Sequence, residues 1–382
     1  MTTHLFVQGY WGNNLGDDLF LEALCNRYPN VQFTISGKKN FISVFKNIKN
    51  LNVIQQKNNF ITKLTNKIYS KYGILTPYDK LGFNYDGYVE IGGSIFILPN
   101  KENIVDMWLK RRKFIIERNT NYFIIGSNFG PYFFQKQLIE YRNFFSKVTS
   151  INFRDLNSYE MFSDMPNVNV APDVVLNIDD EKYTVIKKNN YVVISVVNLK
   201  IKAKSPGSEE LISFDKEFED KLLELTLYYL SHGYDEVVLM SFCESEGDLK
   251  TCKNIVNRIR EINYRKRVEI FSHRDINKSL NIINGASLII ASRFHAMILG
   301  WVFQKPTIVI GYSGKTQQTV DYLNVNQKVL NVEEFIKLSV EEINNFQFLI
   351  DINTLKNLRK ESEEHFKELD FFIESKMNDL LN

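Results

Sequence analysis

The stretch SLIIASRFHAMILGWVFQKPTIVIGYSGK, Ser287 to Lys315, decides the fold class of this chain. It opens with a β-branched apolar run, Ser287–Ala291, and continues with a segment of helical length, His295–Phe303. A second β-branched run, Thr307–Ile310, follows. Strand, helix and strand in this order predict a βαβ unit, because two parallel strands need a long crossover connection. The stretch therefore predicts an α/β fold with a mostly parallel sheet.

The same alternation extends over most of the chain. In the first half we expect strands at His4–Gln8, Val31–Ile35, Tyr88–Ile91, Tyr122–Ile125 and Ser150–Phe153, and helices at Asp17–Arg27, Asn103–Arg118 and Gln135–Ser146. In the second half we expect further strands at Tyr191–Val197, Glu236–Met240 and Val268–Phe271, and helices at Asp215–Ser231, Leu249–Ile262 and Ile276–Asn284. A chain of 382 residues is also too long for a domain with a single hydrophobic core of ordinary size, so two domains are expected. We therefore predict domains at residues 1–180 and 181–350, with a hinge within Pro172–Asn190, and one helix over residues 351–382.

Composition excludes several classes of protein. The chain has 47 basic and 45 acidic residues, so it lacks the positive excess of a nucleic-acid binder. Its three cysteines are scattered and form no CxxC pair, which argues against a disulfide framework and a structural zinc site. The N-terminus does not read as a signal peptide, and no apolar run approaches the ~20 residues of a membrane span. We expect a cytoplasmic protein, soluble or resting on the inner face of the membrane.

A glycine-rich loop, GYWGNNLGDD (Gly9–Asp18), follows the first expected strand. Its glycines allow a close backbone approach to a ligand, and the helix that starts near Asp17 presents free N–H groups. Asn13 and Asn14 can add hydrogen bonds. The alternative is a tight turn with an aspartate cap. The spacing does not match GxGxxG, so nothing indicates dinucleotide binding.

Further motifs follow other strands of the first half. IGGS (Ile91–Ser94) and IGSNFGPY (Ile125–Tyr132) place glycine and serine at strand ends, where they form a binding rim or serve simply as strand exits. In FRDLNS, Arg154 either binds an anion or pairs with a neighbouring acid such as Asp155. The segment APD, Ala171–Asp173, reads as a turn before the hinge.

Arg293 and His295 stand where the strand Ser287–Ala291 ends and a helix begins. A guanidinium can bind a carboxylate or phosphate through two hydrogen bonds, and a helix N-terminus favours negative charge. Histidine side chains can donate or accept a proton near neutral pH, so His295 is a candidate for proton transfer. Lys315 follows the next strand and can approach the same place. The alternative is a salt-bridged arginine beside a capping histidine.

Taken together, these motifs resemble the polysaccharide pyruvyltransferase family. The resemblance rests on the GD loop, GG after a strand, GSxxGP, RDxxS, PD, and SRFHA followed by PTIVIxYxxK, in this order over roughly residues 5–315. SRFHA and the GD loop are its specific parts. The glycine loop looks one residue shorter than is usual in the family. Asp18 stands where glutamate is common, and Ser94 replaces the third glycine of a triplet.

The resemblance implies two Rossmann-like domains in a glycosyltransferase-B-like arrangement, with a C-terminal helix that packs back on the first. It implies an enzyme that transfers a pyruvyl group from phosphoenolpyruvate to a hydroxyl pair of a sugar and forms a ketal. The sugar belongs to a cell-surface polysaccharide, such as an exopolysaccharide or capsule, or to its precursor, which can be lipid-linked. Phosphoenolpyruvate is then a co-substrate, and neither a cofactor nor a metal site is expected.

The resemblance also implies roles for individual residues. Donor binding is expected from Arg154, Arg293, Phe294 (through its backbone), His295 and Lys315, with Arg293 and His295 catalytic. Acceptor binding in the first domain is expected from Gly12, Asn13, Asn14, Asp17, Gly92, Gly93, Ser94 and Ser127. His295 acts either in proton transfer or on the phosphate, and both roles stay open.

Two rival functions remain. A nucleotide-sugar glycosyltransferase of the same architecture often carries paired glutamates in its second domain, but this chain has no glutamate between Glu269 and Glu333. Some subtypes lack the pair, so this argument alone does not decide. A non-catalytic glycan-binding subunit would have no need of Arg293 and His295, and only turnover distinguishes it.

Contact with a membrane surface is a separate hypothesis. The segments Lys57–Tyr72 and Met107–Arg118 combine apolar and basic residues, as interfacial helices do. The alternative is that both are surface helices whose apolar stripes face the domain core.

Overall fold

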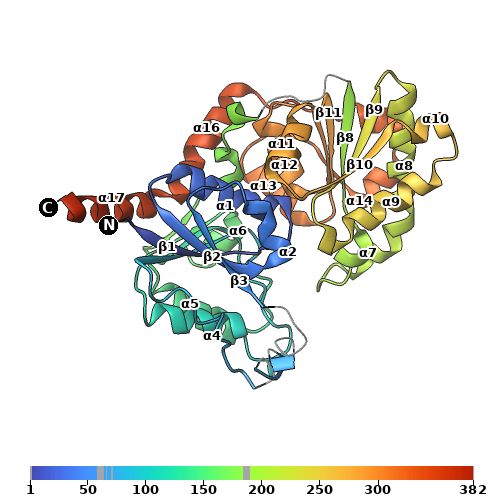
Figure 1. Cartoon of the computed structure of the whole chain (residues 1–382). Coiled ribbons are helices and arrows are strands. Elements are labelled where there is room, and N and C mark those ends of the chain that lie inside the picture. The colour runs from blue at the N-terminus through green and yellow to red at the C-terminus, as the bar shows by residue number, and fades with distance from the viewer. Residues whose placement is uncertain (1, 58–63, 66, 70–71, 184–189, 382) are drawn as a thin grey trace. The chain divides into compact units, whose positions relative to one another are not determined.

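The computed structural model describes residues 2–57, 64–65, 67–69, 72–183 and 190–381 (Figure 1). The chain forms two compact units. The first comprises Met1–Trp11, Phe20–Asn177 and Lys360–Asn382, and the second comprises Gly12–Leu19 and Ile178–Arg359. The main change of unit thus lies within the range expected for the hinge, of which residues 184–189 lie outside the described residues. The glycine loop belongs to the second unit, although we assigned residues 1–180 to the first domain.

The first unit contains a parallel sheet of seven strands in the order β3-β2-β1-β4-β5-β6-β7. The strands are β1 (His4–Gln8), β2 (Gln32–Lys38), β3 (Leu51–Gln56), β4 (Gly87–Ile91), β5 (Tyr122–Ser127), β6 (Ser150–Phe153) and β7 (Val168–Val170). The helices are α1 (Leu15–Arg27), whose first turn is in the second unit, α2 (Lys39–Ile42), α4 (Met107–Ile116), α5 (Gln135–Phe145) and α6 (Leu156–Glu160). The strand order reverses between β1 and β4, which is the doubly wound pattern.

An aromatic core fills one face of this sheet. Alternate residues of β1, β4 and β5, such as Phe6, Tyr88 and Tyr122, pack against α4 and α5 (Figure 1). Within this core Arg112 of α4 donates to the buried carboxylate of Glu90 at 2.8 Å. A buried charge needs such a partner, since an unpaired one would cost several kcal/mol.

The second unit contains a parallel sheet of six strands in the order β10-β9-β8-β11-β12-β13. The strands are β8 (Tyr191–Val196), β9 (Glu236–Ser241), β10 (Val268–Ser272), β11 (Leu288–Ala291), β12 (Thr307–Gly311) and β13 (Val329–Asn331). The helices are α7 (Leu199–Lys202), α8 (Asp215–Ser231), α9 (Asp248–Arg258), α10 (Ile262–Arg265), α11 (Ile276–Asn284), α12 (Phe294–Val302), α13 (Gly314–Tyr322), α14 (Val332–Lys337) and α15 (Val340–Asn344). Helices α8, α9 and α14 lie on one face, and α11 and α12 lie on the other (Figure 1). This is the Rossmann order, with its reversal between β8 and β11.

The C-terminal segment divides into two helices. Where the sequence predicted one helix from Asp351, the structure has α16 (Ile352–Ser362), a 3-10 turn at Glu363–His365 and α17 (Lys367–Leu381). The interruption coincides with anchoring to the first unit: Ser362 Oγ donates to the Asp173 carbonyl at 3.0 Å, and His365 Nε2 bonds the Pro172 carbonyl at 2.8 Å. These contacts join the segment around Ser362 and His365 to the first unit.

Every strand predicted from the sequence is present, and the described part of the chain contains three further strands. The missed strands β3, β7 and β13 are all at sheet edges. An edge strand is half exposed and often short, so it lacks the continuous apolar run of a central parallel strand. β7 and β13 have three residues each, and β3 reads LNVIQQ.

Of the two segments proposed for membrane contact, Lys57–Tyr72 lies partly outside the described residues. In α4 the side chain of Trp108 is 47% exposed, and Lys110 and Lys113 are exposed. Arg111 and Arg112 are buried, which fits the alternative that this helix packs on the domain core. No helix among the described residues is long and apolar enough to cross a membrane. Membrane contact stays a prediction.

Candidate active site

The site forms at the carboxyl edge of the second sheet, where the strand order reverses. Loops after β8 and β11 leave these adjacent strands in opposite directions, which opens room for a ligand in folds of this class. Ser195 of β8 fixes the end of β11, because its Oγ accepts from the backbone N–H of Ser292 at 3.0 Å and of Arg293 at 3.2 Å. The hydroxyl of Ser195 therefore holds the backbone of Arg293 in place.

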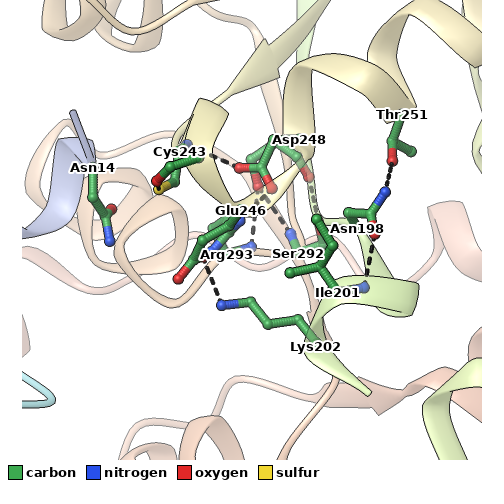
Figure 2. A network of polar contacts seen from close by, with 12 residues as sticks. Asn14, Asn198, Ile201, Lys202, Cys243, Glu246, Asp248, Thr251, Ser292 and Arg293 are labelled. Atoms are coloured by element: carbon green, nitrogen blue, oxygen red, sulfur yellow. Dashed lines mark hydrogen bonds and ion pairs between the residues drawn. The ribbon is translucent and has the colours of Figure 1, made fainter. Parts of the chain in front are cut away.

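Arg293 is the N-cap residue of α12 and is only 7% exposed. Its Nη1 donates to Glu246, and its Nη2 donates to Asp248 (Figure 2). Burial by itself would lower the pKa of Arg293, but Asp248 and Glu246 outweigh it and raise that pKa. The third nitrogen of the guanidinium, Nε, is buried and has no partner among the described residues.

One carboxylate, Glu246, comes from the loop between β9 and α9, and the other, Asp248, is the first residue of α9. Asp248 is fully buried, and its second oxygen accepts from the backbone N–H of Cys243 at 2.9 Å. Burial raises the pKa of Asp248, although Arg293 opposes this. Glu246 has a side chain that is 28% exposed. Burial would raise its pKa too, but Arg293 and Lys202 lower the pKa of Glu246 to about 2.

Lys202 completes the cluster from helix α7, which follows β8. Its ammonium group is 2.6 Å from Glu246 Oε2 and 5.5 Å from the ring centre of Tyr312. Asn198 holds this helix in place: its Oδ1 accepts from the backbone N–H of Ile201 at 2.8 Å, and its Nδ2 donates to Thr251 at 2.9 Å (Figure 2). Two cations and two carboxylates thus meet at one sheet edge.

The glycine loop lies against the same edge. Leu15 donates its N–H to the carbonyl of Phe242 at 3.0 Å, and Asn14 forms a β-bridge with Cys243. Gly16 packs so closely on the imidazole of His295 that a Cβ would be 1.9 Å from Nδ1. Only glycine allows this approach.

A buried hydrogen-bonded chain anchors the first turn of α1. Asp18 Oδ2 is 3.0 Å from His273 Nε2, and His273 Nδ1 is 2.7 Å from Ser279 Oγ. The Ser279 hydroxyl donates to the Asp275 carbonyl at 2.8 Å, so Nδ1 must be the donor toward it. The hydrogen bond between Asp18 Oδ2 and His273 Nε2 then needs a second proton, carried either by the carboxyl group or by Nε2. Burial raises the pKa of Asp18 well above its ordinary value, which favours a protonated carboxyl that donates to Nε2.

The first unit has its own cluster at a sheet edge. Arg154, at the end of β6, binds Asp173 at 2.7 Å rather than its neighbour Asp155. Its guanidinium lies so close to Gly93 that a Cβ there would be 2.2 Å from Nη2. Asn128 Oδ1 accepts from Arg154 at 3.4 Å and from Ser94 at 3.3 Å. The segments IGGS, GSNFGP, FRD and APD therefore meet at one place.

The structure divides the expected donor and acceptor residues between the units. Arg293, Phe294, His295 and Lys315 lie in the second unit with Gly12, Asn13, Asn14 and Asp17, whereas Arg154, Gly92, Gly93, Ser94 and Ser127 lie in the first. The rings of Phe294 and His295 are 5.2 Å apart in an edge-to-face arrangement. Lys315 is exposed in the first turn of α13, and Ser127 is fully buried.

Sequence reasoning missed Lys202, Glu246, Asp248 and His273. Each follows the carboxyl end of a predicted strand, and the turn CESEGD after β9 carries the glycine and acids typical of a strand-to-helix loop. That signal was available but did not indicate which cation the acids bind. Among the described residues, no group of three His, Cys, Asp or Glu side chains could hold a metal ion.

Comparison with known proteins identifies a family and a relative that match most of the chain. The sequence model of the polysaccharide pyruvyl transferase family matches residues 14–314. The amylovoran biosynthesis protein AmsJ of Erwinia amylovora is 22% identical over 284 residues, which are 69% of this chain and 65% of that protein. The match therefore spans less than two thirds of that relative.

Solved structures share the fold at low identity. Anabaena Alr3699/HepE, solved with UDP and glucose, has a TM-score of 0.52 and 12% identity, and the match covers 100% of this chain and 99% of that one. The UDP-GlcNAc 2-epimerase of Methanocaldococcus jannaschii has a TM-score of 0.54 and 13% identity, with 97% and 100% covered. These likenesses confirm the predicted α/β class with two Rossmann-like domains.

Proposed function

The chain belongs to the polysaccharide pyruvyl transferase family, and we propose that it transfers a pyruvyl group from phosphoenolpyruvate to a hydroxyl pair of a sugar. The product would be a cyclic ketal on a polysaccharide or its precursor. The similarity to an amylovoran biosynthesis protein supports a role in making a polysaccharide.

One observation carries the proposal beyond family membership: Arg293 is buried at the switch point of the second sheet, and its Nε donor has no partner among the described residues. Phosphoenolpyruvate has a carboxylate and a phosphate, and both need cationic hydrogen-bond donors. An arginine at this position is suited to such a ligand, because its planar fork binds oxyanions.

The reaction needs a group that transfers protons, and His295 lies two residues after Arg293 in the sequence. A proton is added to the methylene carbon of phosphoenolpyruvate, and a sugar hydroxyl attacks the adjacent carbon and loses its proton. The second hydroxyl then displaces phosphate and closes the ketal, and its proton leaves with the phosphate. We propose that His295 carries one of these protons, and that its ring is oriented by contact with Gly16.

Turnover tests the proposal directly. The full chain is incubated with phosphoenolpyruvate and candidate sugar acceptors, and phosphate release and pyruvyl ketal formation are measured. We expect Arg293→Lys to lower kcat/KM by at least about tenfold, since a lost charge-assisted hydrogen bond costs ~1.5–3 kcal/mol. Exposed Lys200→Gln is the control. Wild-type rates in both Arg293→Lys and Arg293→Ala would refute the assignment.

A second candidate is a nucleotide-sugar glycosyltransferase. It is favoured by one observation, the fold shared with a protein that was solved with UDP and glucose. The same assay with UDP-glucose as donor distinguishes the two, because release of UDP without use of phosphoenolpyruvate would support the second candidate.

A further inference from the structure

We propose that Lys202 is the second cation of the donor site, and that the carboxylate of Glu246 marks the place of a donor oxyanion. This inference rests on the proposed function only for the identity of the donor. Its physical content is that an incoming anion exchanges with Glu246 between Arg293 and Lys202.

The carboxylate of Glu246 makes the contacts that a bound anion would make at this place. Its Oε2 accepts from Arg293 Nη1 and also from Lys202 Nζ at 2.6 Å (Figure 2). Among the described residues its side chain accepts from no backbone N–H group. One oxygen shared by two cations is how a phosphate or carboxylate oxygen would sit here.

The two carboxylates of the cluster differ in a way that makes only one exchangeable. Asp248 is fully buried and is tied to the backbone N–H of Cys243. The side chain of Glu246 is 28% exposed and comes from a short 3-10 turn, Glu244–Glu246. Glu246 can therefore turn to water, whereas Asp248 stays and holds the guanidinium of Arg293.

The charges require such an exchange. Arg293 and Lys202 supply two positive charges, and Glu246 and Asp248 supply two negative ones, so the cluster is formally neutral. A neutral cluster offers little attraction to an anion. Once Glu246 leaves, one positive charge is uncompensated, and the buried Nε of Arg293 is a further donor for the ligand.

The experiment measures donor affinity by calorimetry on the full chain. Phosphoenolpyruvate and UDP-glucose are each titrated into the wild type, Lys202→Gln, Lys202→Arg, Glu246→Gln and Lys200→Gln. Lys200 is the matched control, because it is an exposed lysine of the same helix. A thermal melt of each variant establishes folding.

We expect Lys202→Gln to raise the Kd at least about tenfold, in line with the loss of a charge-assisted contact. Lys202→Arg should restore binding to within a few-fold. Glu246→Gln should lower the Kd several-fold, because the competing anion is gone, and Lys200→Gln should match the wild type.

The inference is overturned if Lys202→Gln binds like Lys200→Gln, or if Glu246→Gln weakens binding. If the same pattern appears with UDP-glucose but not with phosphoenolpyruvate, the inference stands and the proposed function fails. If phosphoenolpyruvate is turned over but the pattern is missing, the proposed function stands and the inference fails. A wild type that binds neither anion refutes both.

Discussion

The chemistry of Arg293 depends on its partners as much as on its guanidinium. In isolation an arginine at a strand end is an anion-binding residue, yet here two carboxylates already hold it. Removal of one partner of such a buried pair leaves an uncompensated charge and typically costs ~3–5 kcal/mol. Asp248→Ala should therefore affect folding, whereas a change at the partly exposed Glu246 should be tolerated.

Gly16 gives a sharper test at the scale of one residue. A methyl group at this position would meet the ring of His295, which can only move away. We expect Gly16→Ala to lower kcat at least about tenfold while the protein stays folded, since alanine favours a helix by ~1 kcal/mol over glycine. Steady-state kinetics and a thermal melt measure both effects.

A double-mutant cycle separates this effect from general damage. In a His295→Ala background the Gly16→Ala change should cause no further loss of kcat, because the clashing ring is gone. If Gly16→Ala is equally harmful with and without the imidazole, the contact does not orient His295.

At the scale of elements, the start of α1 is held by the buried pair of Asp18 and His273. If Asp18 is the protonated partner, an amide can replace it as the donor to Nε2. We expect Asp18→Asn to keep or raise the free energy of unfolding at pH 7, because the unfolded wild type is stabilised by releasing a proton that the amide does not carry. Asp18→Ala should be ~1–3 kcal/mol less stable than Asp18→Asn, because a buried acceptor loses its partner. Urea unfolding measures both.

The two variants also distinguish the position of the proton. Equal destabilisation by Asn and Ala would mean that a carboxylate paired with an imidazolium holds the helix. The raised pKa of Asp18 also predicts how stability depends on pH. The contribution of a protonated Asp18 to the free energy of unfolding is complete below the ordinary pKa of 3.8, and it is lost as the pH rises through the folded-state pKa. Asp18→Asn should lose that dependence.

At the scale of the whole molecule, the end of the chain returns to the first unit. Residues 360–382 belong to this unit, and the buried His365 fixes them to the carbonyl of Pro172. Burial lowers the pKa of His365 from 6.5 to about 4; Asp173 nearby opposes this shift and Arg154 adds to it. The docking of the last segment is therefore sensitive to acid.

The direction of the pH effect follows from which state of the chain, folded or unfolded, is protonated first as the pH falls. As the pH falls below 6.5, the unfolded chain binds a proton that the folded chain binds only near pH 4, so the free energy of unfolding declines. From pH 7 to pH 5 this residue should contribute a loss of about 2 kcal/mol. In urea unfolding, His365→Gln should remove that part of the decline. An unchanged pH dependence in the variant would contradict the assignment.

The sequence by itself determined the two parallel α/β domains and the place of Arg293 and His295. Hydrophobic runs and their spacing are local properties, and residues after a parallel strand must lie at the carboxyl edge of its sheet. That rule placed the motifs IGGS, GSNFGP and FRD at one edge without knowledge of a single contact, whereas APD was expected only as a turn because the strand before it was missed.

Only the tertiary structure decided which groups meet at those edges. The pairing of Arg293 with Glu246 and Asp248, and of Arg154 with Asp173, joins loops of different strands. The placement of Gly16 on His295 likewise joins segments far apart in the chain. Such contacts depend on strand order and on packing between distant segments, and neither can be read from the spacing of hydrophobic residues in the sequence. The charge state of the site therefore became visible only in the folded chain.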